Sequence, residues 1–177
     1  MINGLSKEFS KKTIAEQKEA FSDLLLSPVL NTDFTGCRLN GTNVQVAVCA
    51  SPDTVMYLAR ENKGHKGVKG TPIEYYQGVL VHDHDKTFYN YGSEHQECLA
   101  HVLRYLKDGI ENEPNLTWNK QMRELLQEMI HYRNSLDLDA DLEPDIVAEY
   151  EVRYLNILDT AKDEYEYEPP SNYYIDG

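Results

Sequence analysis

Four stretches of the chain place apolar residues along one face of a helix. The first covers residues 13–26, where Thr13 and Glu16 form the capping-box pattern typical of a helix start. The other three occupy the second half of the chain. Their apolar positions are Leu99, Val102, Leu103, Leu106 and Ile110, then Trp118, Met122, Leu125, Leu126 and Met129, and then Ile146, Val147, Tyr150, Tyr154, Ile157, Leu158 and Ala161.

Between the first helix and the later ones, apolar residues alternate with polar ones or form short compact runs, as in β-strands. We expect strands over residues 29–34, 44–49, 54–59 and 78–83. Asn40-Gly41 provides a turn between the first two, and residues 72–76 predict a short crossover helix. Three strands, a crossover, a fourth strand and then helices indicate an α/β fold with a mixed sheet, which resembles the ribonuclease H-like fold.

Charge divides the chain near residue 108. The net charge is −13; residues 1–107 carry 12 Lys and Arg against 12 Asp and Glu, and residues 108–177 carry 5 against 18. Phosphate groups attract Lys and Arg, so the acidic part is a poor nucleic-acid binder, whereas the neutral part is not excluded. The expected organisation is an N-terminal helix in 1–28, a partial ribonuclease H-like core in 29–107, an acidic helical insertion in 108–168 and a frayed tail in 169–177.

The composition places the chain among cytoplasmic globular proteins. Hydrophobic residues make up 41% and charged residues 27%, so wholesale disorder is excluded. No apolar run approaches the roughly 20 residues of a membrane span, and the polar first residues do not form a signal peptide. Three cysteines without an export signal indicate a reducing compartment. We therefore expect no membrane partner.

Two aspartates stand at the ends of predicted strands. Asp33 ends the first strand and Asp83 ends the fourth. If these strands are neighbours, both carboxylates emerge at one edge and can bind a hard cation such as Mg²⁺, which takes oxygen ligands. Two such cations activate water and stabilise the leaving oxygen in phosphodiester cleavage. The alternative is that each aspartate is an ordinary strand-end or turn residue.

Histidine and cysteine residues raise a second possibility, a zinc site. His82 and His84 share a face of the fourth strand, and Cys98 and His101 share a face of the following helix, after His95. No second Cys/His pair lies close in sequence to complete a structural site. We therefore expect these residues to pack and to form hydrogen bonds, with Cys98 and His101 near the end of the Asp83 strand and without zinc.

The segment 62–70 is rich in glycine and lysine. Two interpretations are open: its lysines contact a DNA backbone, or it is a solvated connection. The glycine motifs of nucleotide-binding loops and of serine hydrolases are absent, and the sequence indicates no organic cofactor.

Taken in order, these motifs resemble the transposases of the insertion sequence 66 family, members of the Asp-Asp-Glu recombinase group. The resemblance covers about residues 20–135. The matching blocks are Val29-Leu30-Asn31-Thr32-Asp33-Phe34-Thr35-Gly36 with Arg38-Leu39-Asn40-Gly41, and Gly78-Val79-Leu80-Val81-His82-Asp83 with Phe88, Tyr91-Gly92, His95, Cys98-Leu99-Ala100-His101 and Leu103-Arg104.

The resemblance implies DNA cutting and joining by two-metal phosphodiester hydrolysis and strand transfer. Asp33 and Asp83 would be the catalytic acids and metal ligands for Mg²⁺ or Mn²⁺. Their supporting residues would be His82, Cys98, His101 and Arg104. Element ends and target DNA would be the partners, and the protein would form a homo-oligomer.

Two departures from the family change this expectation. Phe34 stands where the family usually has Glu after its first aspartate, and no late glutamate lies in the family's third block, shortly before Arg. We therefore expect a fragment or truncated member that binds metal weakly and is inactive alone. The alternative function is a non-catalytic acidic interaction protein or DNA mimic built from residues 108–177.

Overall fold

The chain forms two compact units, each with its own core. The computed structural model describes residues 2–137 and 140–165, with side chains from residue 4 onward. The first unit is Met1–Cys98 and the second is Leu99–Gly177.

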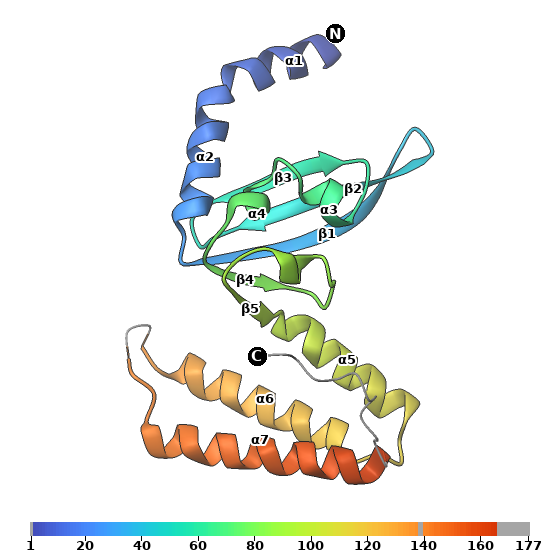
Figure 1. Ribbon diagram of the computed structural model, residues 1–177, viewed down its shortest axis with the longest axis vertical. Coiled ribbons are helices and arrows are strands. Elements are labelled where there is room, and N and C mark those ends of the chain that lie inside the picture. The colour runs from blue at the N-terminus through green and yellow to red at the C-terminus, as the bar shows by residue number, and fades with distance from the viewer. Residues whose placement is uncertain (1, 138–139, 166–177) are drawn as a thin grey trace. The chain divides into compact units, whose positions relative to one another are not determined.

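The first unit is built on a five-stranded mixed sheet (Figure 1). The strands β1, β2 and β3 form an antiparallel meander, and β4 and β5 follow on the other side of β1 in parallel. The order β3-β2-β1-β4-β5 with these directions is that of the ribonuclease H-like fold, so the predicted fold class is confirmed. The strand bounds are β1 (Val29–Leu39), β2 (Thr42–Ala50), β3 (Val55–Arg60), β4 (Val79–His82) and β5 (Glu94–Glu97).

Helices cover one face of this sheet. They are α2 (Ile14–Leu26), α3 (Gly64–Val68) and α4 (Pro72–Tyr75), with a 3₁₀ turn at Phe88–Asn90. The helix α1 (Ile2–Lys12) precedes α2, and its apolar residues Leu5 and Phe9 are exposed. Leu24 from α2, Val68 from α3 and Ile73 from α4 are fully buried against Leu30 of β1 and Leu80 of β4. Burial of these apolar side chains is the main force that holds the helices on the sheet.

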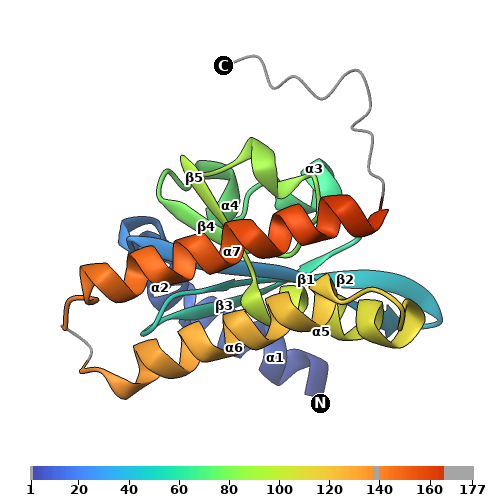
Figure 2. The same ribbon diagram turned by 90° about the horizontal axis from the view of Figure 1, so that it is seen from below.

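The second unit consists of three helices, α5 (Leu99–Asn112), α6 (Trp118–Ser135) and α7 (Pro144–Tyr165). Figure 2 shows α6 and α7 side by side and antiparallel. The core of the unit contains Leu106 from α5, Met122 and Leu125 from α6, and Ile157 from α7. None of the helices within the described ranges is long and apolar enough to cross a membrane.

The predicted helices and strands are present, with three differences. The strand β5, of sequence Glu-His-Gln-Glu, was not predicted, because its residues lack the apolar alternation of a strand. The predicted capping box is wrong: Thr13 makes no side-chain cap bond, and its N–H donates to Phe9 O, so α1 runs on into α2. The glycine-rich segment contains the short helix α3.

The division between the units falls at Cys98–Leu99, whereas the change in charge falls near residue 108. Leu106 of α5 shares a core with Met122 and Leu125 of α6, so α5 packs within the helical unit. The four-part organisation expected from the sequence stays a prediction, and the tail 169–177 lies outside the described residues.

Candidate functional site

The prediction that Asp33 ends the first strand is wrong, because β1 continues in its pairing with β2 as far as Leu39. Asp83 directly follows the last residue of β4, as expected. The strands β1 and β4 are parallel, and Val29 pairs with Val79 and Asn31 with Val81. Continuing this register by two positions would place Asp33 beside Asp83, the first residue after β4. Neighbouring strands lie about 4.8 Å apart. The closeness of the two acids stays a prediction.

The alternation of side chains along β1 determines the face on which Asp33 lies. Thr32 and Phe34 of β1 are buried on the core side, and so is His82 at the end of β4. Successive residues of a strand point to opposite faces, so Asp33 faces away from that core. Both Asp33 and Asp83 are half-buried. A common site for the two carboxylates stays a prediction.

Backbone amides orient both carboxylates. Asp33 Oδ1 accepts a hydrogen bond from Phe34 N at 2.7 Å, and Asp83 Oδ1 accepts one from Asp85 N at 3.2 Å. The second oxygen, Oδ2, of each has no hydrogen-bond partner among the residues that the structure describes. Each aspartate therefore keeps one oxygen available for a cation.

This donor set fits a hard divalent cation of the Mg²⁺ type. Mg²⁺ usually binds one or two carboxylates and keeps several waters, so two half-buried aspartates with free oxygens suit it. Within residues 2–137 and 140–165, no group of three or more His, Cys, Asp or Glu side chains is arranged to hold a metal ion. A metal site at Asp33 and Asp83 therefore stays a prediction.

A buried histidine fixes the backbone beside Asp83. His82 is fully buried, and its Nδ1 forms a short hydrogen bond to the backbone oxygen of Asp83. A carbonyl oxygen only accepts, so Nδ1 of His82 carries the proton. Its Nε2 contacts Nδ1 of His95 at 3.2 Å, so in the neutral ring Nε2 accepts from His95. Both nitrogens of His82 are engaged in hydrogen bonds.

Side chains also tie the edge strand β5 to the loop after β4. The Tyr89 hydroxyl donates to Glu97 Oε1 at 2.6 Å, and Nδ1 of His84 contacts the same oxygen. The Tyr89 hydrogen bond, followed by that of His84, lowers the pKa of Glu97 against the effect of its burial. Burial, and then the nearby His82, lowers the pKa of His95. These polar contacts hold the strand that the sequence did not reveal, and composition alone carried no signal for them.

The remaining predicted supporting residues lie on both sides of the boundary between the units. The backbone N–H of Cys98 donates to His82 O at 2.7 Å, which places Cys98 next to the end of β4, as expected. His101 and Arg104 lie on α5 in the second unit. Nδ1 of His101 is buried and has no hydrogen-bond partner among the described residues, and Arg104 is exposed. Their proximity to Asp83 stays a prediction.

Phe34, the residue that departs from the family pattern, belongs to the core. It is 7% exposed, and its ring stacks on that of Phe88 with centroids 5.7 Å apart. Its side chain points away from the face on which Asp33 lies. The substitution of Glu by Phe at this position therefore leaves the carboxylate pair unobstructed.

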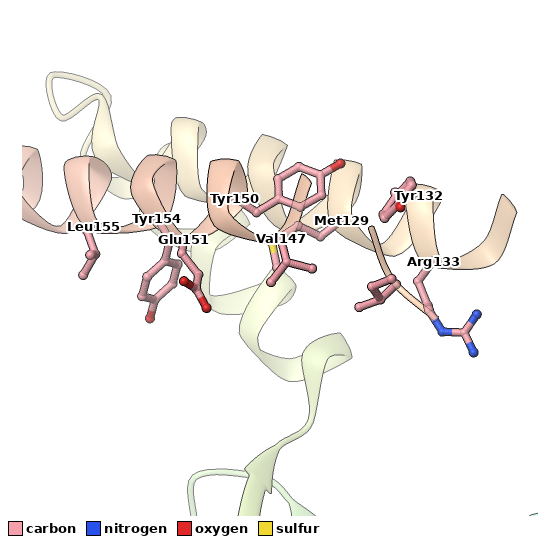
Figure 3. A pocket seen from close by; sticks show the side chains of 9 residues that line it. Met129, Tyr132, Arg133, Val147, Tyr150, Glu151, Tyr154 and Leu155 are labelled. Atoms are coloured by element: carbon pink, nitrogen blue, oxygen red, sulfur yellow. The ribbon is translucent and has the colours of Figure 1, made fainter. Parts of the chain in front are cut away.

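The second unit contains a separate groove between α6 and α7, shown in Figure 3. Its volume is about 560 Å³, and Tyr150, Tyr154 and Val147 of α7 line it with Met129 of α6. The lining of the groove contains one carboxylate, that of Glu151. The groove therefore lacks the paired acids on which two-cation chemistry depends.

Residues 8–168 match the family described as "Transposase IS66 family". The comparison with curated proteins gave no significant match.

Among solved structures, the chain is similar to the HTLV-2 integrase catalytic core domain in complex with magnesium, in a dimeric form. The identity is 12% and the TM-score 0.31, over 52% of this chain and 79% of that chain. It is also similar to a chain of the simian T-cell lymphotropic virus intasome in complex with PP2A regulatory subunit B56 gamma. That identity is 12% and the TM-score 0.32, over 52% of this chain and 45% of that one.

Proposed function

We propose, since the chain belongs to the IS66 transposase family, that its first unit carries the metal-dependent site at which DNA phosphodiesters are cut and joined. Asp33 and Asp83 are the acids of this site. The observation that supports the proposal is the parallel pairing of β1 with β4, whose register, continued by two positions, would bring these two residues level.

The two aspartates hold Mg²⁺ or Mn²⁺ through the oxygens that the backbone leaves free. Bound divalent cations supply activation of water and stabilisation of the charge that develops on the attacking and leaving oxygens. The protein's own part is to fix the carboxylates. Phe34 N and Asp85 N each bind one carboxylate oxygen, and His82 acts as a positioning residue because it holds the backbone oxygen of Asp83.

The proposal includes the partners expected from the sequence. Element ends and target DNA are the substrates, further copies of the chain form the oligomer, and the cytoplasm is the location. The supporting roles expected of His101 and Arg104 from the sequence stay predictions. Metal binding is expected to be weak, since two carboxylates replace few of the waters of a hard cation.

The test is a DNA-nicking assay with Mn²⁺ and element-end DNA, using a transposase that contains this chain together with the family's third acid. Asp33→Ala and Asp83→Ala should each reduce nicking by about 100-fold or more, because each removes charge that acts at the reacting phosphate. The matched control is Asp53→Ala, which removes an exposed acid in the turn between β2 and β3.

Nicking that survives in Asp33→Ala or Asp83→Ala at the level of the Asp53→Ala control would contradict the proposal. The 177-residue chain by itself is expected to nick no faster than its own Asp83→Ala variant, since the third block of the family was not found in its sequence. Robust metal-dependent nicking by this chain would show that another of its acids completes the site.

A further inference from the structure

The basic segment 60–69, defined here as Arg60 to Lys69, is a folded element of the first unit. It contains four basic residues, Arg60, Lys63, Lys66 and Lys69, and one acid, Glu61. Its backbone at Gly67 and Val68 is buried, and α3 lies within it. A merely solvated connection would leave these positions exposed, so the segment has a fixed place in the fold.

Tight backbone packing anchors the middle of the segment. Arg60 Nε donates to Gly67 O at 2.9 Å. A Cβ atom at Gly67 would lie 2.2 Å from Asn62 O and 3.0 Å from ring carbons of Phe34. The absence of a side chain at Gly67 therefore lets the segment approach Phe34 of β1 closely.

Further hydrogen bonds fix both ends of α3. Thr71 Oγ1 donates to Val68 O at 2.6 Å, and Gly70 N donates to Glu74 Oε2 at 2.5 Å. On the other side, Nδ1 of His65 and the Tyr91 hydroxyl form a hydrogen bond of 2.8 Å. The segment is ordered before any ligand arrives, so binding costs little further backbone entropy.

The segment lies next to the loop that follows Asp83. A Cβ atom at Gly64 would lie 3.7 Å from Thr87 Oγ1. Lys63 is also close enough to Asp85 to interact with it electrostatically. Gly67 packs on Phe34, which faces the side of β1 opposite to Asp33. The segment is therefore a neighbour of the Asp83 loop.

The lysines of the segment are available to a ligand. Lys63, Lys66 and Lys69 are exposed, and within the described part of the chain none of them forms an ion pair. Residues 1–107 are neutral as a whole, so this concentration of positive charge is a local feature. Ammonium groups on flexible stems bind phosphate oxygens and release the counterions of a DNA backbone.

We propose that the basic segment 60–69 is a phosphate-binding surface that holds the backbone of double-stranded DNA next to the loop that follows Asp83. This inference rests on the proposed function and adds the surface that carries the substrate. Carboxylates at a cutting site repel the phosphates they act on, and cations fixed on the adjoining segment offset that repulsion.

The test compares two triple variants with equal loss of charge. Lys63→Gln/Lys66→Gln/Lys69→Gln removes the proposed surface. Lys7→Gln/Lys11→Gln/Lys18→Gln removes three exposed lysines from α1 and α2. Binding of a fluorescein-labelled duplex of about 30 base pairs is followed by anisotropy over a series of salt concentrations, with EDTA present so that no metal contributes.

The slope of log K against log salt should fall by about three in the segment variant, about one for each lysine that no longer meets a phosphate. Its affinity near 50 mM salt should fall by about tenfold or more. The slope of the α1–α2 variant should change by less than about one. Both variants should melt within about 2 °C of the wild type, since all six lysines are exposed.

Equal slopes in the two variants would overturn the inference, because the effect would then follow from net charge alone. A wild-type chain that does not bind the duplex would overturn it too, and tighter binding of an RNA duplex than of DNA would assign the surface to a different partner. None of these results tests the proposed catalytic role of Asp33 and Asp83. Failure of the proposed function would appear separately, as nicking that does not depend on Asp33 or Asp83.

Discussion

At the scale of single residues, the alternation along β1 explains how two neighbours serve different purposes. Phe34 faces the core, where it packs on Phe88 and against Gly67, and Asp33 faces the opposite side. In the sequence, Phe34 is a departure from the family pattern, and no role could be assigned to it there. The structure gives it one, because its ring holds the segment that carries the lysines against the strand that carries the first acid.

Replacement of Gly67 by alanine tests this packing. Gly67→Ala should lower the free energy of unfolding by about 2 kcal/mol or more, because its Cβ meets the Asn62 backbone and the Phe34 ring. Gly36→Ala, in the same strand as Phe34, is the control; its nearest neighbours are 3.9 Å away on the flexible Gln45 side chain, and the cost should stay within about 1 kcal/mol. Urea unfolding followed by circular dichroism measures both, and equal costs would contradict the packing.

The cysteines offer a second test at this scale. Cys49 is fully buried in the core, and burial raises the pKa of its thiol to about 12. Cys37 is exposed. At pH 8, iodoacetamide should therefore modify Cys37 within minutes and leave Cys49 unmodified until the chain is unfolded, because only the thiolate reacts. Mass spectrometry of tryptic peptides gives the result, and early labelling of Cys49 would show that the core of the first unit opens.

At the scale of elements, the side chain of one helix completes the start of another. The carboxylate of Glu164, in the last turn of α7, accepts hydrogen bonds from Thr117 N at 2.8 and 3.0 Å and from Trp118 N at 3.1 Å. The first N–H groups of a helix have no partner within it, so Glu164 caps α6. This cap could not be predicted from sequence patterns, because Glu164 lies far along the chain from Thr117 and Trp118.

Glu164→Ala should lower the melting temperature of the helical unit, whereas Asp163→Ala, which removes an exposed acid next to it, should not. The hydrogen bonds from the Thr117 hydroxyl and then from Trp118 N lower the pKa of Glu164 below its ordinary 4.5. Its stabilisation is therefore complete above about pH 4.5 and is lost as the pH falls through the lowered pKa. Melting curves from pH 7 to pH 3 should show the gap between wild type and Glu164→Ala closing, and a gap that persists at pH 3 would contradict the cap.

At the scale of the whole molecule, the fold followed from patterns that are local in sequence. The periods of apolar residues predicted four of the five strands and the three later helices. A shared site for Asp33 and Asp83 at one edge of the sheet was predicted as well, and it stays a prediction. The strand β5 was missed because Glu94-His95-Gln96-Glu97 is polar and is held by contacts of His82, Tyr89 and His84 that only the fold creates. The role of His82 in binding the Asp83 backbone could not be read either, since it depends on how the loop after β4 turns.

The position of the acidic charge is the other property of the whole molecule that bears on function. Residues 108–177 carry all of the net negative charge, so a DNA mimic remains the rival account of the chain. The two accounts differ in where a divalent cation goes. A cutting site would bind the divalent cation at Asp33 and Asp83, whereas an acidic surface would bind cations at many positions of the helical unit.

The most direct measurement is paramagnetic broadening of amide signals by Mn²⁺ in the ¹⁵N-labelled chain. Mn²⁺ below one equivalent should broaden the amides of residues 33–34 and 83–85 first, excess Mg²⁺ should reverse the effect, and Asp33→Asn/Asp83→Asn should abolish it while Asp53→Asn does not. Broadening that is centred on residues 108–165 and is unchanged in Asp33→Asn/Asp83→Asn would contradict a metal site at Asp33 and Asp83.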